Sequence, residues 1–356
     1  MPANTLIIQT AFIGDVILTT PLIHATKAAF PEARVSMLVI PSTANILGNN
    51  PYLEEVIRYD KKGRDRGLSS LLRLAHALSA RSFDLAMLPH RSFRSAALAA
   101  LARIPRRIGF DVSPTSFLFT DVVPYRQGAH EVERNGDLLR ALDIEPEPES
   151  PRIFPDDKDH EVADILLGEH MEIDRVSLSP PLPFSPSDGK GRRVALAPGS
   201  IWPTKRWPLA YFAQVAELLM KAGVRVILMG GPSDRALCNE IARRTTHAPL
   251  IAAGQLTLRE SAALLAQCDL LLTNDSAPAH MAAAMGTPVF AVFGPTTTSL
   301  GFAPYGPGHT ILEVPLDCRP CGKHGGKKCP NGHFRCMKDL APERVFGEMM
   351  AKLKRT

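Results

Sequence analysis

The chain has 356 residues, a formal net charge of +5 and ordinary globular composition, with 45% hydrophobic and 22% charged residues. That length suits two domains, each large enough to bury a core. The small positive excess does not by itself argue for nucleic acid, but it suits an anionic substrate or an acidic membrane surface.

The first part of the chain alternates short apolar runs with longer helical patterns. Strands separated by helices pair in parallel through right-handed crossovers. This pattern predicts a doubly wound α/β domain over residues 1–150. The expected elements are a strand at 5–11, a helix at 15–30, a strand at 34–41, a helix at 68–81, a strand at 83–90 and a helix at 94–104.

Residues 151–192 are rich in proline and charge, which predicts a linker with a short helix near 160–170. Its acids at 157–159 are expected to be solvated surface. The α/β alternation then restarts and predicts a second domain over 193–338, with a terminal helix at 339–356. In that second part we expect strands at 193–200, 224–232, 269–277 and 288–295, and helices at 207–223, 233–245, 257–268 and 278–286.

Ligands of doubly wound folds bind beyond the carboxyl ends of the strands. The loops that follow predicted strands are therefore the candidate binding segments. They lie at 10–15, 199–205, 230–234, 273–276 and 294–298.

Asp15 stands in "TAFIGDVILTTP", where the first predicted strand turns into the first helix. An acid at this position is either the cap of the helix or a catalytic base, and the two roles can coexist. A helix start stabilises a carboxylate, which by itself makes the acid a weaker base.

The segment "APGSIWPTKRWP" places hydroxyl and basic groups at the entrance of a predicted helix. Backbone N–H groups and the helix dipole favour an anion there, and fixed cations strengthen that preference. The alternative is a solvated basic turn. The candidate anion ligands are Ser200, Thr204, Lys205 and Arg206.

Two further strand ends carry residues that are candidates to bind a diphosphate or a ribose. Asp275, Ser276 and His280 lie where "LLLTNDSAPAHM" passes from strand to helix, and a diphosphate there would meet N–H groups, a hydroxyl and an imidazole. The alternative is an ordinary cap with a packed histidine. Asp234, in "MGGPSDRA", is either a ribose ligand or an N-cap.

The first domain also carries basic residues, in "HRSFRS" and "RIPRRIGF". Arg91, Arg94, Arg106 and Arg107 are candidates to hold a phosphorylated or carboxylated acceptor. The alternative is ordinary solvated charge.

Four cysteines crowd into the glycine-rich segment 318–336, with the spacing C-x2-C-x7-C-x6-C. This spacing is compatible with a structural zinc site. Reduced thiols and a disulfide are the alternatives. The residues concerned are Cys318, Cys321, Cys329 and Cys336.

Several sequence motifs do not occur in the chain, and this narrows the range of possible functions. Neither G-x-G-x-x-G nor G-x-x-x-x-G-K-[ST] occurs, which disfavours a conventional nicotinamide or flavin site and a P-loop ATPase. No apolar run approaches the roughly 18 residues of a membrane span, and no secretory signal is visible. We therefore expect a cytoplasmic protein that touches a membrane only at its surface.

Taken together, these motifs resemble the lipopolysaccharide heptosyltransferases, and within them the heptosyltransferase II group. The resemblance runs from Leu6 to the terminal helix. It rests on the ordered set "IGDVILTTP", "APGS…PTKRWP", "TNDSAPAHMAAAMGTP", "FGPT" followed by "PYG", and "CRPC…CPNGHFRCM".

The resemblance implies a GT-B-like architecture, with two Rossmann-like doubly wound parallel-sheet domains facing across a cleft. Residues 1–150 would bind the acceptor, 193–338 the nucleotide sugar, and the terminal helix would pack back towards the first domain. The implied reaction is an inverting transfer of L-glycero-D-manno-heptose from ADP-heptose to the inner core on lipid A. We expect no cofactor to be required for catalysis and no nucleic acid to be bound, and we expect the enzyme to lie peripherally at the inner membrane.

Matching the motifs residue by residue, the resemblance makes Asp15 the general base and Lys205 the donor-phosphate lysine, with Ser200 in the same loop. Asp275, Ser276 and His280 match the donor motif. Leu256 falls where an adenine contact is expected. One departure is Ala277, where the family often has glycine. The alternatives are another nucleotide-sugar glycosyltransferase, a nucleotide-sugar epimerase, or a non-catalytic protein that binds an anionic glycan.

Overall fold

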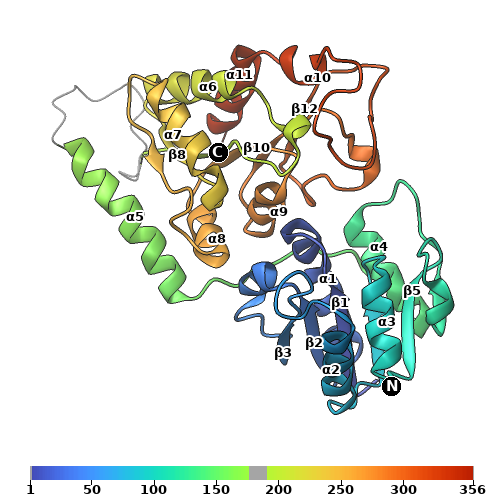
Figure 1. The fold of residues 1–356 in the computed structure, drawn as a ribbon. Coiled ribbons are helices and arrows are strands. Elements are labelled where there is room, and N and C mark those ends of the chain that lie inside the picture. Colours follow the sequence, from blue (N-terminus) through green and yellow to red (C-terminus); the bar gives the residue numbers. More distant parts are fainter. Residues whose placement is uncertain (1, 176–190, 356) are drawn as a thin grey trace. The chain divides into compact units, whose positions relative to one another are not determined.

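The computed structural model describes residues 2–175 and 191–355, and the side chains of 169–175 are not described. The chain divides into two compact units, residues 1–154 and 155–356. Each unit contains a six-stranded sheet, and all the strand pairs are parallel. Figure 1 shows helices beside both sheets. The predicted α/β class with two doubly wound parallel sheets is confirmed.

The sheet of the first unit has the strand order β3-β2-β1-β4-β5-β6. The order reverses between β1 and β4, where the connections leave in opposite directions and open a crevice at the carboxyl ends of the strands. Its strands are β1 (Asn4–Gln9), β2 (Arg34–Val39), β3 (Glu55–Arg58), β4 (Leu85–Leu88), β5 (Arg106–Phe110) and β6 (Asp121–Val123).

The helices of the first unit pack on two sides of this sheet. Leu6 and Ile8 of β1 join the core cluster formed with α2 and α3, so the period of two along a strand turns Ile7 to the opposite face. Helices α1 and α4 contact each other, as do α2 and α3. The helical segments are α1 (Ile13–Ala29), η1 (Pro41–Leu47), α2 (Leu68–Ser79), α3 (Phe93–Leu101), η2 (Ser116–Leu118), α4 (Glu131–Asp137) and η3 (Leu138–Leu142).

The second unit repeats this plan, with the strand order β12-β11-β10-β7-β8-β9 and its reversal between β7 and β10. Its strands are β7 (Arg193–Ala197), β8 (Arg225–Leu228), β9 (Leu250–Ile251), β10 (Leu270–Asn274), β11 (Val289–Phe293) and β12 (Thr310–Glu313). Its helical segments are α5 (Asp157–Arg175), η4 (Pro203–Lys205), α6 (Leu209–Lys221), η5 (Pro232–Asp234), α7 (Arg235–Arg243), α8 (Leu258–Ala266), α9 (Ala277–Ala284), η6 (Thr298–Leu300), α10 (Arg335–Lys338) and α11 (Pro342–Leu353).

The expected linker 151–192 contains more structure than its composition suggested. The second unit begins at residue 155, and α5 packs against α8. Asp159 is buried and lies 3.2 Å from the guanidinium of Arg259, so this acid is an ion-pair partner and the expectation of solvated surface is wrong for it. Residues 176–190 of the expected linker lie outside the described residues.

The terminal helix α11 packs on α6 in the second unit. Val345, Met349 and Leu353 belong to the same core cluster as Leu219. The expected packing of this helix against the first domain stays a prediction. Over residues 2–175 and 191–355, no helix is long and apolar enough to cross a membrane.

Candidate functional site

Asp15 lies at the strand-order reversal of the first sheet, where β1 turns into α1. It is the third helical residue, and its Oδ2 accepts a hydrogen bond from the N–H of Phe12 at 3.1 Å. This capping bond satisfies a donor that the helix start would otherwise leave open. The carboxylate therefore does cap the helix, at the sheet edge where ligands of such folds bind.

A polar network lies beside Asp15 at the ends of β1 and β4. The hydroxyl of Thr10 is 3.3 Å from Nδ1 of His90 and 3.1 Å from Oγ of Ser95, and Lys61 donates to the carbonyl of Thr10 at 2.7 Å. Burial lowers the pKa of His90 to about 4, and the nearby cations Lys61 and Arg91 add to the effect. His90 is therefore a neutral imidazole at pH 7, which can accept or donate a hydrogen bond without adding charge.

The lowered pKa of His90 predicts a pH dependence of stability. Between pH 6.5 and 4 the unfolded chain binds a proton at this residue and the folded chain does not. Stability is therefore lost as the pH falls through this window, by up to about 1.4 kcal/mol per pH unit. We expect His90→Gln to lose less stability than the unmodified chain between pH 7 and pH 5, measured by urea unfolding. Equal losses in the two proteins would contradict this assignment.

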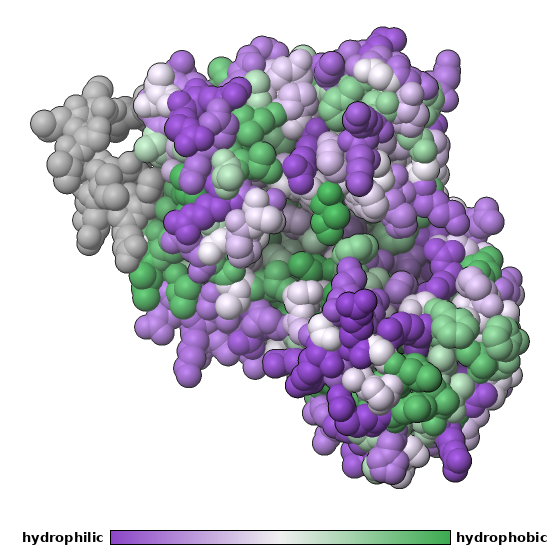
Figure 2. Space-filling model, in the orientation of Figure 1, coloured by the Kyte–Doolittle hydropathy of each residue, from purple (hydrophilic) through white to green (hydrophobic). Residues whose placement is uncertain are grey.

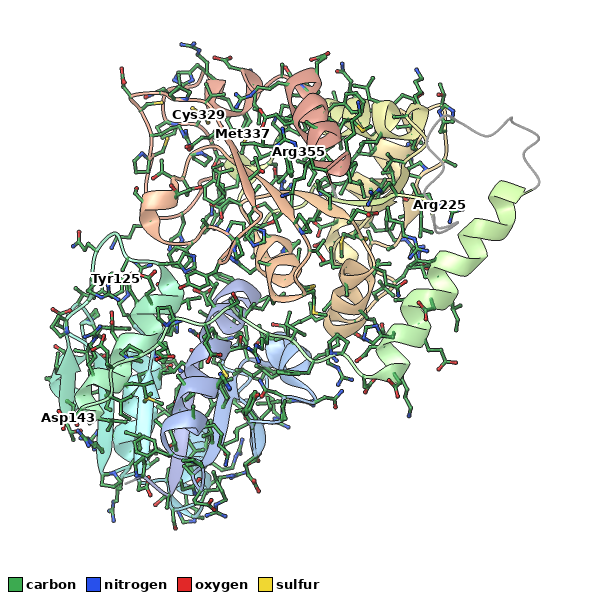
Figure 3. The ribbon with its side chains drawn as sticks, turned by 180° about the vertical axis from the view of Figure 1, so that it is seen from behind. Tyr125, Asp143, Arg225, Cys329, Met337 and Arg355 are labelled. Atoms are coloured by element: carbon green, nitrogen blue, oxygen red, sulfur yellow. The ribbon has the colours of Figure 1, made fainter. Side chains whose placement is uncertain are left out.

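A buried carboxyl group, Glu131, also lies near Asp15. Burial raises the pKa of Glu131, the Asp15 carboxylate adds to the rise, and Arg134 opposes it. Arg134 pairs with Glu131 at 2.7 Å, and its guanidinium lies 4.7 Å from the ring centre of Tyr125. Arg91 lies 4.9 Å from the same ring, so two cations flank one aromatic residue. Figure 3 labels Tyr125, which follows β6.

The four predicted acceptor arginines do not come together. Arg94 donates to the hydroxyl of Tyr59 at 2.9 Å and to the carbonyl of Gly67, so it links α3 to the loop before α2. Arg106 and Arg107 begin β5, at the amino edge of the sheet, opposite to Asp15 and His90. Arg106 binds Asp121, and Arg107 binds backbone carbonyls, including that of Leu118. Arg91 and Arg94 both follow β4, at the carboxyl edge, and Arg91 is the one that lies beside Tyr125.

In the second unit, the two strongest donor candidates are ion-paired with each other. Nζ of Lys205 lies 2.6 Å from Oδ2 of Asp275, and the hydroxyl of Thr296 donates to the same oxygen at 2.6 Å. Asp275 is buried, and Lys205 is mostly buried. The pair lies at the reversal between β7 and β10. The carboxylate of Asp275 holds the ammonium group of Lys205 in place at this sheet edge.

The loop around this pair is held by backbone contacts. The side chain of Asn274 accepts from the N–H of Trp207 at 2.9 Å and donates to the carbonyl of Pro198 at 2.8 Å. Arg206, which was predicted to bind the sugar-nucleotide donor, donates a hydrogen bond to the carbonyl of Ser200 at 2.8 Å. Its guanidinium is therefore bonded within its own loop. Ser276 is the N-cap of α9, and His280 is buried in that helix.

Asp234 is a cap in this structure. Its Oδ2 accepts from the N–H of Gly231 at 3.0 Å, at the start of η5. Its carboxylate lies against Gly199, where a Cβ would come within 2.3 Å of Oδ1. A side chain at position 199 would therefore displace Asp234. Leu256 is half-buried, just before the Thr257 cap of α8.

The cysteine-rich loop 318–336 contacts the segments that carry Lys205 and the Thr296 partner of Asp275. Thr204, a predicted donor ligand, is instead hydrogen-bonded to Gly326, and a Cβ on Gly325 would lie 2.9 Å from Cγ of Lys205. On the other side Arg319 donates to the carbonyl of Thr296 at 2.8 Å. One loop thus fixes both the segment that carries Lys205 and the segment that carries Thr296.

The four cysteines of this loop are free thiols in the structure. Burial raises the pKa of Cys336 to about 11, and the thiols of Cys321, Cys329 and Cys318 add to the rise. Cys321, Cys329 and Cys336 line one pocket. Figure 3 labels Cys329 in this loop. Within residues 2–175 and 191–355, no three His, Cys, Asp or Glu residues are arranged to hold a metal ion. The zinc site stays a prediction that metal analysis of the purified protein can test.

Some site residues were not found from the sequence. His90 and Arg91 were seen as part of a basic motif, but Lys61, Tyr125, Glu131 and Thr296 were not assigned to the site. The available signal for Thr296 was its place after a predicted strand, in the loop 294–298. Glu131 and Tyr125 follow β6, a strand that the sequence analysis did not identify.

Comparisons with known proteins identify relatives of the chain and similar folds. A model of glycosyltransferase family 9 (heptosyltransferase) matches residues 71–332. The chain is 26% identical to lipopolysaccharide heptosyltransferase 2 of Salmonella typhimurium, covering 98% of each chain. It is 30% identical to lipopolysaccharide heptosyltransferase 3 of Escherichia coli, covering 80% of this chain and 82% of the relative. The solved structure of the E. coli ADP-heptose LPS heptosyltransferase II is similar, with a TM-score of 0.78 and 24% identity over 99% of each chain.

Proposed function

The chain belongs to glycosyltransferase family 9, the heptosyltransferases, and from this premise we propose that it transfers heptose from ADP-heptose to the inner core of lipopolysaccharide with inversion at the anomeric carbon. The observation that carries the proposal is the Lys205–Asp275 pair beside the start of α9. It presents an oriented cation and a helix N-terminus to an anionic group at one sheet edge. These are the features that binding of a nucleotide diphosphate requires.

We propose the heptosyltransferase II reaction within this family. The relative named heptosyltransferase 2 matches over 98% of both chains, whereas the relative named heptosyltransferase 3 matches over 80% of this chain. The fuller coverage favours the second heptosyl transfer. The acceptor is then an inner core that already carries a heptose on lipid A.

In the proposed mechanism the carboxylate of Asp15 accepts the proton of the acceptor hydroxyl as its oxygen attacks the anomeric carbon. The bond from that carbon to the diphosphate breaks, and ADP leaves with the added negative charge. Lys205 and the start of α9 stabilise that charge, which is the electrostatic role that a metal ion fills in other enzymes. A single displacement of this kind inverts the configuration at the anomeric carbon.

The charge state of the first unit fits this division of roles. Arg91 offers a cation to an anionic acceptor at the same edge as Asp15, and His90, which is neutral at pH 7, adds no charge there. Because the proposed acceptor is anchored in a lipid, we also propose that the enzyme works in the cytoplasm, at the inner-membrane surface.

The donor assignment is tested by nucleotide release. We expect ADP-heptose to support turnover with a heptosylated core acceptor, and UDP- and GDP-sugars to support none above background. Chromatography of the released nucleotide measures this directly. Turnover with a UDP-sugar, but not with ADP-heptose, would overturn the proposed donor and leave a different glycosyltransferase.

A further inference from the structure

Large apolar side chains are exposed on adjoining elements of the first unit. Single exposed apolar residues are common, but contiguous ones mark interaction sites. Helix α2 packs against α3, and η2 also contacts α3, so the three elements form one surface. We call it the α2–α3 face, and its exposed members are Leu68 (69%), Leu72 (47%), Phe93 (65%), Leu101 (44%) and Phe117 (75%).

On the α2–α3 face, hydrophobic residues are surrounded by hydrophilic ones. In Figure 2, hydrophobic green residues gather over the part of the first unit where α3 lies, and hydrophilic residues border them. Leu68 and Leu72 are four residues apart in α2, so they share one side of that helix. An apolar strip with a polar border is the pattern of an interfacial surface.

The part of the chain that contains α2 and α3 is strongly basic. Residues 61–110 contain eleven Lys or Arg and two Asp or Glu, a net charge of +9, although the whole chain carries only +5. The remainder is therefore net negative. Asp65 faces Arg64 and Arg73, and Asp84 accepts from the N–H of Ala3. Two cations of the segment pair with acids outside it, Arg81 with Glu55 and Arg106 with Asp121, and subtracting these two from the net +9 leaves an excess of +7. Helices α2 and α3 themselves contain no acid.

The α2–α3 face borders the site of the first unit. Arg94 of α3 bonds the carbonyl of Gly67, just before α2, and Lys61 of the same loop bonds Thr10 beside Asp15. Both helices begin at the carboxyl edge of the sheet, where Asp15 also lies. A surface held against this face therefore lies next to the residues proposed to receive the acceptor.

We propose that the α2–α3 face docks on an anionic lipid bilayer, inserting its leucine and phenylalanine side chains among the headgroups. Lys and Arg side chains near such a surface are attracted by its negative potential. The apolar side chains bury against acyl chains at the headgroup boundary. A second copy of the chain is disfavoured as the occupant, because two faces of like charge repel each other. Only the purpose of this docking, delivery of a lipid-anchored acceptor, rests on the proposed function.

The test is sedimentation of the full chain with vesicles, without donor or acceptor, so that its outcome does not depend on turnover. We expect binding to phosphatidylglycerol vesicles to exceed binding to phosphatidylcholine vesicles at least tenfold, and to weaken as salt is raised. The triple variant L72S/L101S/F117S removes apolar side chains that take no part in the site. We expect it to lose at least tenfold in vesicle affinity while keeping its thermal unfolding midpoint and its turnover with a detergent-solubilised acceptor.

The matched control is V162S/I165S, which removes two exposed apolar side chains of α5 in the other unit. We expect this control to bind vesicles like the unmodified chain. The proposal is overturned if the triple variant binds like the unmodified chain, or if the control loses as much affinity. Self-association in the absence of vesicles that the triple variant abolishes would assign the face to a second copy, and would also overturn the proposal.

Discussion

Asp15→Asn is expected to lower kcat by roughly 10²–10⁴-fold, the usual contribution of a positioned general base, with little change in ADP affinity. The amide oxygen of asparagine can still accept the N–H of Phe12, so the cap of α1 is retained. The amide cannot accept the proton of the acceptor hydroxyl. This variant therefore separates the capping role of residue 15 from its catalytic role, which Asp15→Ala would remove together.

The measurements are steady-state kcat, calorimetric affinity for ADP and the thermal unfolding midpoint. A matched control is Asp15→Glu, which keeps a carboxylate but moves it by one methylene, and we expect it to retain more turnover than Asp15→Asn. If Asp15→Asn turned over within a few-fold of the unmodified enzyme, Asp15 would be a cap and the base would be another group. A carboxyl group close enough to interact with Asp15 is that of Glu131.

Lys205→Met is expected to weaken ADP binding and to destabilise the second unit. Methionine keeps the length and the apolar stem of lysine but removes the cation that would face the diphosphate. It also leaves the carboxylate of Asp275 buried with Thr296 but without its cation. Breaking a buried pair in this way costs up to about 3 kcal/mol of the free energy of unfolding.

The double variant Lys205→Met/Asp275→Asn separates these two effects. Replacing the carboxylate with a neutral amide removes the unpaired charge, so we expect most of the lost stability to return. ADP affinity should stay weak, because the cation is still missing. Recovery of ADP binding together with stability would show that Lys205 acts on the fold alone and does not contact the donor.

The parts of the fold that the sequence predicted are those with strong local patterns. The central strands β1, β4, β7 and β10 are continuous apolar runs, because they are buried on both faces. The strands it missed lie at the edges of the two sheets or, for one of them, next to an edge. They are β3, β5, β6, β9 and β12.

Missing β5 had a direct effect on the predicted site. Without that strand, Arg106 and Arg107 appeared to be part of a loop beside the acceptor. As the first residues of a parallel strand, they lie at the amino edge, where the chain enters the sheet. Only the strand assignment separates these two arginines from Arg91.

The Lys205–Asp275 pair shows a second limit of prediction from local sequence patterns. Each residue was correctly placed after a strand, and each was interpreted as a separate donor contact. Their pairing follows from the adjacency of β7 and β10, which are separated by more than 70 residues in the chain. The hydrogen bond from Thr204 to Gly326 joins residues that are even further apart in the chain. Such contacts depend on tertiary packing and have no signature in the neighbouring sequence.

The central claim is heptosyl transfer from ADP-heptose to a lipid A core that already carries one heptose. It is tested most directly by incubating the enzyme with ADP-heptose and core acceptors truncated at defined sugars, followed by mass spectrometry of the lipid products. We predict the addition of one heptose to the acceptor that ends in heptose, and no addition to the acceptor that lacks it. Addition to the heptose-free acceptor alone, or no heptose on any acceptor while ADP still binds, would contradict the account.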